Sequence, residues 1–168
     1  MILPEGALVL LVGAPAAGKS TLAAALVAAG EVDAEDVLST DTYREVLSGD
    51  ALDLTSDRKV WVQVSERLVE KMQAGRTTVV DATNLFPHRR ARHIAVAREQ
   101  GRPVVAIHFE VPAAQLLERN DARERVLRPN VVVTMAVEME EHAGTDALAA
   151  EVDIVLDAED VRRRLSEP

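Results

Sequence analysis

Residues 13–20 have the residue types and the spacing of a phosphate-binding loop. They fit the pattern G-x-x-x-x-G-K-[ST], in which small residues let backbone N–H groups curl around phosphate oxygens. Lys19 is expected to reach the β and γ phosphates, and Ser20 to offer its hydroxyl to Mg²⁺. The sequence therefore predicts ATP and Mg²⁺ as ligands, with the nucleotide held by Gly13, Ala14, Pro15, Ala16, Ala17, Gly18, Lys19, Ser20 and Thr21.

Asp41 and Arg44 form a second candidate pair, which follows a short strand expected at residues 37–39. A carboxylate at the end of a strand can lie across from the γ phosphate, so Asp41 is the candidate general base for an acceptor hydroxyl. Arg44 shares a helix face with Asp41 and is a candidate for binding a phosphate or another polar group of the acceptor. The alternative is that Asp41 only caps the helix and that Arg44 is its solvated partner. Beside a phosphate-binding loop, the catalytic interpretation is favoured.

Asp81 and Asn84 follow another β-branched run, residues 77–80. Asp81 is predicted to organise Mg²⁺ through a water molecule, as a carboxylate near the phosphates. A plain turn residue is the alternative for Asp81. Asn84 is a candidate for positioning the substrate or the water shell of the metal.

Arg119 and Arg123 lie in the charged segment 118–125 and share one helix face. Such a segment can close over ATP as a lid, because the rigid guanidinium fork bridges phosphate oxygens as charge spreads over the transferring group. The alternative is a surface helix whose acidic and basic side chains pair with one another. The position directly after the fourth strand and its helix favours the lid.

A cluster of three arginines, Arg89, Arg90 and Arg92, begins shortly after Asn84. It could receive a phosphate of the acceptor, although an exposed helix face explains most of it equally well. Arg90 is the residue of the cluster that we retain as a candidate for the acceptor site.

Short apolar runs alternate with longer amphipathic segments along the chain. Strands are expected at residues 7–12, 37–39, 77–80, 104–109 and 154–156, and helices at 18–29, from 41, 57–74, 87–100, 112–120, 133–142 and 159–165. This alternation predicts an α/β fold with a parallel sheet, right-handed crossovers and helices on both faces. Ligands bind at the carboxyl ends of such strands, where the loop, Asp41 and Asp81 would meet.

Composition and charge limit the classes of protein to which this chain can belong. The 168 residues are 48% hydrophobic but only 2% aromatic, which suits a single domain over residues 1–168 with a core of Val, Leu, Ala and Ile. The net charge of −9 argues against coating nucleic acid over many phosphates, but it allows a protein to grip one strand end. The chain has no cysteine, its four histidines lack metal-ligand spacing, and neither a membrane span nor a signal peptide is evident, so we expect a cytoplasmic protein without membrane contact or structural zinc.

Four motifs give the chain a family resemblance: GKST at 18–21, LSTDTYR at 38–44, TVVDATN at 78–84 and ERNDAR at 118–123. Over nearly its whole length the sequence resembles the kinase domain of bacterial polynucleotide kinase-phosphatases, which are RNA-repair enzymes, and more distantly the phage polynucleotide kinases. The resemblance implies transfer of the ATP γ phosphate to a 5′-hydroxyl end of RNA or DNA, with Asp41 as base, Arg44 on the acceptor phosphate, and Arg119 and Arg123 in the lid. It also implies a P-loop kinase (adenylate-kinase-like) sheet of five strands in the order 2-3-1-4-5.

Two other functions stay open at this point. A small-molecule kinase of the same fold, acting on a nucleoside, sugar or antibiotic hydroxyl, is favoured slightly by the acidic balance and by the scarcity of aromatic residues for base stacking. Tyr43, Trp61 and Phe86 are the aromatic candidates near the expected mouth. A nucleotide-dependent switch without an acceptor is the third hypothesis. The domain is either complete in itself or a module of a longer repair protein.

Overall fold

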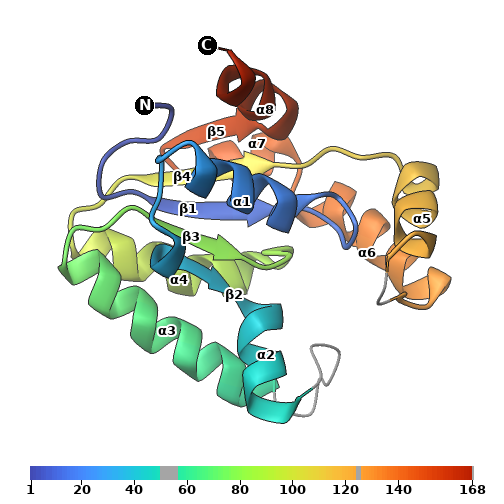
Figure 1. The fold of residues 1–168 in the computed structure, drawn as a ribbon, viewed down its shortest axis with the longest axis horizontal. Coiled ribbons are helices and arrows are strands. Elements are labelled where there is room, and N and C mark those ends of the chain that lie inside the picture. The colour runs from blue at the N-terminus through green and yellow to red at the C-terminus, as the bar shows by residue number, and fades with distance from the viewer. Residues whose placement is uncertain (50–56, 124–125, 168) are drawn as a thin grey trace.

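Five parallel strands form one sheet in a computed structural model that describes residues 1–49, 57–123 and 126–167. The spatial order is β2-β3-β1-β4-β5, which confirms the expected order. The central strand β1 pairs with β3 on one side and β4 on the other, so the sheet is built around it (Figure 1). The strands are β1 (Leu8–Val12), β2 (Val37–Ser39), β3 (Thr78–Asp81), β4 (Val104–His108) and β5 (Ile154–Asp157).

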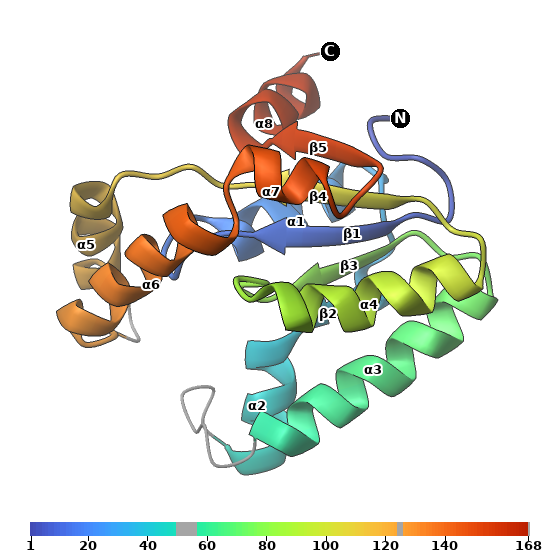
Figure 2. The same cartoon turned by 180° about the vertical axis from the view of Figure 1, so that it is seen from behind.

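Helices cover both faces of this sheet. The helices are α1 (Lys19–Ala28), α2 (Thr40–Ser48), α3 (Asp57–Gln73), α4 (Pro87–Glu99), α5 (Ala113–Asp121), α6 (Pro129–His142), α7 (Thr145–Ala149) and α8 (Ala158–Ser166), and a 3₁₀ turn spans Ala34–Asp36. Helices α1 and α8 lie on the face turned toward the viewer in Figure 1, and α3, α4 and α7 lie on the opposite face in Figure 2. Helix α5 and the first part of α6 extend past the carboxyl end of β1.

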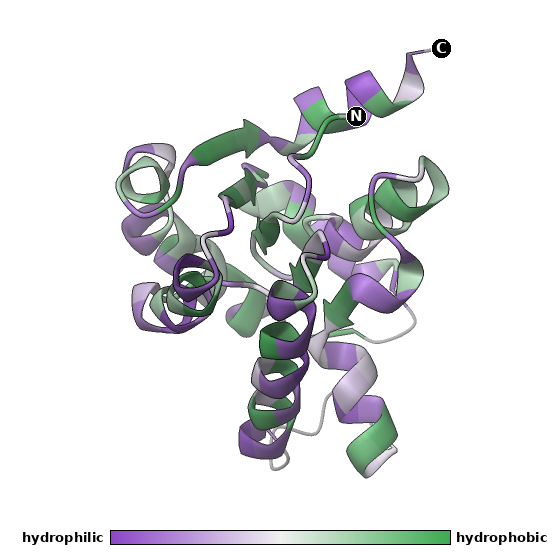
Figure 3. Cartoon of the chain, turned by 90° about the vertical axis from the view of Figure 1, so that its left-hand side faces the viewer, coloured by the Kyte–Doolittle hydropathy of each residue, from purple (hydrophilic) through white to green (hydrophobic). Residues whose placement is uncertain are grey.

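The core consists of two apolar layers, one on each side of the sheet. Side chains alternate along β1, so that Val9 and Leu11 pack toward α1 and α8, whereas Leu8, Leu10 and Val12 pack toward α3 and α4. A strand buried on both faces reads as a continuous apolar run, which is why β1 was predictable. Figure 3 shows the same pattern, with green strands inside and helices banded in green and purple.

Helix α3 presents one apolar face to the sheet. Its residues Val60, Val64, Leu68 and Met72 recur at every fourth position and are all fully buried. This confirms the helix predicted from the same spacing. None of the helices in the described residues is long and apolar enough to span a membrane.

Two helices differ from the prediction. Helix α6 begins at Pro129 rather than near residue 133. The N–H of the first helical residue has no partner within the helix, so proline, which lacks an N–H and has a helical φ, is well suited to that position. Helix α7 was not predicted, since its five residues are too few to show a periodic pattern. It follows α6 after Gly144 and buries Leu148 beneath the sheet.

Candidate active site

The phosphate-binding loop lies between β1 and α1, as predicted. The N–H of Gly13 donates to the carbonyl oxygen of Thr83 at 3.2 Å, which ties the loop to the segment after β3. A Cβ at Gly13 would lie 2.7 Å from Cβ of Phe109, so this position has no room for a side chain. Gly18 and Ala16 have φ values of 94° and 65°. The left-handed conformation of Ala16 costs roughly 1–2 kcal/mol relative to glycine and is tolerated here by the folded loop.

Lys19 folds back over this loop. Its Nζ donates to the carbonyl oxygens of Gly13 at 2.9 Å and Ala14 at 2.8 Å. Burial lowers the pKa of Lys19 from 10.5 to about 8, while the nearby carboxylates of Asp81 and Asp41 act in the opposite direction. The ammonium group is therefore weakly solvated and close to both acidic residues, where a phosphate would offer it better acceptors.

Asp81 ends β3 next to Ser20, the first-turn residue of α1. Its carboxylate is almost fully buried, and burial raises its pKa, partly offset by hydrogen bonds from the Ser20 and Ser39 hydroxyls and by the charge of Lys19. Mg²⁺ prefers oxygen ligands and usually keeps several waters. The Ser20 hydroxyl and the Asp81 carboxylate are oxygen groups of the kind that Mg²⁺ prefers, and binding of the ion by these two residues stays a prediction.

Asp41 lies in the first turn of α2, but it does not cap the helix. The cap is Ser39, whose side chain accepts from the N–H of Thr42. The side chain of Asp41 is 59% exposed, and its Oδ1 accepts from Nη1 of Arg44 at 2.8 Å. The alternative in which Asp41 serves only as the N-cap is therefore wrong.

Arg44 is largely buried below this carboxylate. Its Nη2 donates at 2.9 Å to Oδ1 of Asp57, the first residue of α3. The guanidinium group thus bridges two carboxylates and fixes the orientation of Asp41 from below. The interpretation of Arg44 as a solvated partner is wrong as well.

An open cleft of about 500 Å³ extends from Ser20, at the end of the phosphate-binding loop, to Asp41. Its walls come from α1, β2 and α2, and the side chains of Ser20, Ser39, Asp41, Thr42, Glu45 and Asp81 supply oxygen atoms to its lining. The cleft therefore joins the expected metal ligands to the expected base. An acceptor hydroxyl placed in it would lie between the loop and Asp41.

Three arginines surround the other side of the loop. Arg119 on α5 brings Nη1 to 3.5 Å from the carbonyl oxygen of Ala17, and the charge of Arg123 lowers the pKa of Lys19. Both lie near the loop, although the closing motion of a lid stays a prediction and residues 124–125 of that segment fall outside the described residues. The third arginine, Arg162 on α8, was not predicted from the sequence to lie near the loop. Its Nη2 lies 3.5 Å from the carbonyl oxygen of Gly18, and only the strand order, which sets α8 beside α1, could have indicated this contact.

The predicted acceptor contact of Arg90 is contradicted by its burial. The side chain has no exposed surface, and its Nε and Nη2 atoms each lie 2.7 Å from an oxygen of Glu151. The remaining donors bind the carbonyl oxygens of Asn84, Leu85 and His142. With five N–H donors engaged, Arg90 joins α4 to the ends of α6 and α7 rather than meeting a substrate.

Asn84 also has a structural role in place of the predicted substrate contact. It is 2% exposed, with a φ of 47°, and its Nδ2 donates to the carbonyl oxygens of Leu11 at 2.9 Å and Val80 at 3.1 Å. The amide therefore braces the carboxyl ends of β1 and β3. The three aromatic residues considered for base stacking pack instead against the apolar layer under α3 and α4. They are Tyr43, Trp61 and Phe86, and each is partly buried.

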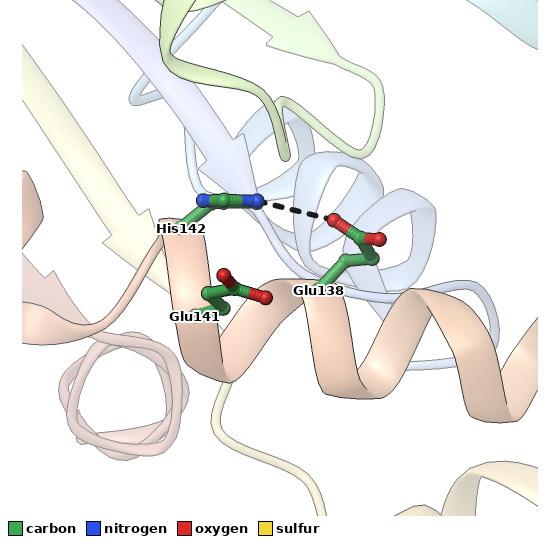
Figure 4. Close-up of side chains that lie close together, drawn as sticks. All are labelled: Glu138, Glu141 and His142. Atoms are coloured by element: carbon green, nitrogen blue, oxygen red, sulfur yellow. Dashed lines mark ion pairs between the residues drawn. The ribbon is translucent and has the colours of Figure 1, made fainter.

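One further group of ionisable side chains lies on α6. Ligand atoms of Glu138, Glu141 and His142 lie within 4.8 Å of one another, and Nε2 of His142 is 3.2 Å from a carboxylate oxygen of Glu138 (Figure 4). These side chains are exposed or half-exposed. Glu138 and His142 are one helical turn apart, and their ion pair accounts for the contact between them.

Comparisons with known proteins agree with this fold. A family model described as an AAA domain, AAA_33, matches residues 8–148. None of the curated proteins compared with the chain matches it. A chain from the Pnkp1/Rnl/Hen1 RNA repair complex is similar in structure, with a TM-score of 0.69 and 18% identity over 83% of this chain and 45% of that chain. The present chain thus spans less than half the length of that relative.

Two further solved structures match over most of both chains. A gluconokinase from Sinorhizobium meliloti 1021 has a TM-score of 0.63 and 17% identity over 97% of this chain and 91% of its own. A sugar kinase from Janibacter sp. HTCC2649 has a TM-score of 0.61 and 22% identity over 96% of this chain and 92% of its own. At such identities the likeness is one of fold, and a fold of this kind serves several acceptors.

Proposed function

This chain belongs to the AAA_33 family of AAA domains, and we propose that it transfers the γ phosphate of ATP to the 5′-hydroxyl end of an RNA or DNA strand. Its fold is P-loop kinase-like, which supports phosphoryl transfer as the general reaction. The observation that carries the proposal is the 2.8 Å ion pair between Asp41 and Arg44 at the cleft beside the loop. It combines an acceptor for a hydroxyl proton with a cation for a neighbouring phosphate.

The base in this reaction is Asp41. Arg44 binds its Oδ1, which leaves Oδ2 to accept a hydrogen bond from the attacking hydroxyl. In phosphoryl transfer the transition state is loose, so orientation of the hydroxyl matters more than its early deprotonation. Asp41 then receives the proton as the new O–P bond forms and the bond between the β and γ phosphates breaks.

The loop and the arginines stabilise the transferring group. Lys19 exchanges the carbonyl oxygens of Gly13 and Ala14 for phosphate oxygens, and Arg119 and Arg123 approach from α5. Ser20 and, through water, Asp81 would hold Mg²⁺, which neutralises charge on the β and γ phosphates when bound. Positive charge around the phosphoryl group supplies most of the catalysis in reactions of this class.

The polynucleotide acceptor is supported by the placement of Arg44. A 5′-terminal nucleotide carries its first phosphodiester close to the hydroxyl that is phosphorylated, and a cation next to the base suits that phosphate. The motifs around Asp41 and Asp81 and the structural likeness to a chain of an RNA repair complex support the same acceptor.

A sugar or polyol is the second candidate acceptor. Beside its alanine and valine residues, the cleft has hydroxyl and carboxylate side chains in its lining, and these hydrogen-bond readily to a polyhydroxy compound. The match to a gluconokinase and a sugar kinase over nine-tenths of their length favours the same candidate.

The first test is transfer of labelled γ phosphate from ATP, with Mg²⁺, to a short 5′-hydroxyl RNA, the matching DNA and gluconate. We expect transfer to an oligonucleotide, and Asp41→Asn should lower kcat about 100-fold because a positioned general base contributes at least that much. ATP affinity should change little in this variant. Glu99→Gln, on the exposed face of α4, is the matched control and should transfer at the native rate.

The other outcomes assign the other functions. Transfer to gluconate without transfer to either oligonucleotide would replace the proposal with a sugar kinase. ATP turnover that needs no acceptor and is unaffected by Asp41→Asn would indicate a nucleotide-dependent switch.

A further inference from the structure

Two adjacent arginines at the start of α4 differ in how their guanidinium groups are used. Arg90 is buried and its N–H donors are all engaged, as described above. The side chain of Arg89 is 39% exposed, and within the described part of the chain it makes one ion pair and no hydrogen bond. Its five N–H donors are therefore available to a ligand.

A series of ion pairs connects Arg89 to the proposed base. Its Nη2 lies 3.6 Å from Oδ2 of Asp57, too far for a hydrogen bond, and its guanidinium carbon lies 5.0 Å from the ring centroid of Trp61. Asp57 is also the partner of Arg44, which binds Asp41. Alternating charges thus extend from the base, through Arg44 and Asp57, to Arg89.

The first turns of α3 and α4 lie on the same side of the molecule as α2 (Figure 2), and Asp57 contacts both Arg44 of α2 and Arg89 of α4. Asp57 contacts both arginines, so an anion bound by Arg89 need not share the guanidinium group of Arg44. Stacking on Trp61 orders the Arg89 side chain without using its donors. Because the whole chain has a net charge of −9, binding of an anionic strand depends on such local cations.

We propose that Arg89 binds a second phosphate of the acceptor strand, one phosphodiester farther from the 5′ end than the phosphate next to Arg44. The guanidinium fork suits two phosphate oxygens and would exchange its loose ion pair with Asp57 for direct hydrogen bonds. The inference rests on the proposed function and deepens it, since it makes an oligonucleotide the preferred acceptor over a single nucleotide.

The test compares two 5′-hydroxyl acceptors, a nucleoside 3′-phosphate with one phosphate and a trinucleotide with two internal phosphodiesters. Arg89→Ala should raise the KM for the trinucleotide about tenfold, as expected for one charge-assisted hydrogen-bonded contact, and the KM for the nucleoside 3′-phosphate much less. Arg89→Lys, which keeps the charge but not the fork, should give an intermediate KM. Arg164→Ala, exposed on α8, removes the same charge elsewhere and should change neither constant.

Salt dependence separates a phosphate contact from a merely structural role. Loss of one phosphate contact on a single strand reduces the slope of log KM against log salt concentration by about 0.7. We expect that reduction in Arg89→Ala with the trinucleotide and not with the nucleoside 3′-phosphate. Trp61, the single tryptophan of the chain, provides a second readout, because its fluorescence should change when a phosphate binds the guanidinium group that stacks on it.

Failure of this inference is distinguishable from failure of the proposed function. A native chain that phosphorylates neither acceptor overturns the proposed function and this inference with it. A native chain that phosphorylates both, while Arg89→Ala and Arg89→Lys keep the native KM ratio and the native salt slope, overturns only the second phosphate site. Arg89 would then serve as a structural partner of Asp57.

Discussion

At the scale of single residues, Lys19 shows how the loop is arranged for an anion. Its ammonium group binds two carbonyl oxygens of the loop to which it belongs, and burial lowers its pKa to about 8. A bound phosphate favours the charged form and raises that pKa in the complex. Protonation of Lys19 and binding of ATP are therefore linked.

This linkage predicts a pH dependence of ATP affinity. Below pH 8 the free protein already carries the proton, so affinity should be independent of this group. Above pH 8 the free protein loses the proton while the complex retains it, so affinity should fall by up to about tenfold per pH unit. Calorimetric titration of ATP with Mg²⁺ between pH 7 and 10 measures the effect. Lys19→Arg, whose guanidinium does not titrate in this range, should bind ATP with a flat profile, and an equally flat native profile would contradict the prediction.

At the scale of elements, Arg90 joins helices that are distant in the sequence. It reaches Glu151, 61 residues away, together with the carbonyl oxygen of His142 at the end of α6. A buried guanidinium with this many partners holds α4 against the segment that leads into β5. The sequence has three arginines within four residues, 89–92, and nothing in their spacing distinguishes the buried one from the two more exposed ones.

Arg90→Ala should therefore reduce stability and leave acceptor binding unchanged. Removing one partner of a buried ion pair typically lowers the free energy of unfolding by about 3–5 kcal/mol. Because Glu151 is partly exposed, we expect a loss of about 3 kcal/mol. Urea unfolding measures it, with Arg89→Ala as the matched control on the same helix, for which we expect a loss under about 1 kcal/mol. If Arg90→Ala had native stability and a raised KM for the acceptor, Arg90 would contact the substrate, as expected from the sequence, and the structural role would be wrong.

Elements whose signal is local could be predicted, and contacts between distant elements could not. The loop, β1 and α3 follow from a motif, an apolar run and a spacing of four, because each is specified by neighbouring residues. The cap at Ser39, two residues before the predicted helix start, needed the observed hydrogen bond from Thr42. Arg162, which contacts the loop from the last helix, depends on the strand order of the whole sheet.

At the scale of the whole molecule, the arginines divide the carboxyl edge of the sheet into two sides. Arg44 and Arg89 lie on α2 and α4 and both contact Asp57 of α3, on the side where the acceptor is proposed to bind. Arg119 and Arg123 belong to the segment around α5, which together with the first part of α6 extends past the end of β1 (Figure 1). The phosphate-binding loop lies between the two sides, as transfer from a nucleotide to an acceptor requires.

This arrangement predicts that ATP orders α5. Of the α5 side chains, Leu116 and Asn120 are buried, whereas Arg119 reaches the loop only through a 3.5 Å contact with Ala17. Phosphates bound in the loop would give Arg119 and Arg123 stronger partners and hold α5 against it. Amide hydrogen exchange over residues 113–123 should therefore slow when a non-hydrolysable ATP analogue and Mg²⁺ are added, and exchange in α3 should not change.

The double variant Arg119→Ala with Arg123→Ala separates this ordering from a general stabilisation by the ligand. Binding of the analogue through Lys19 and the loop should persist in the variant, although more weakly, while the slowing over α5 should be lost. Equal slowing of α5 in the native chain and in the double variant would mean that the two arginines do not couple this helix to the nucleotide, and the segment would then be a surface helix whose charges pair with one another.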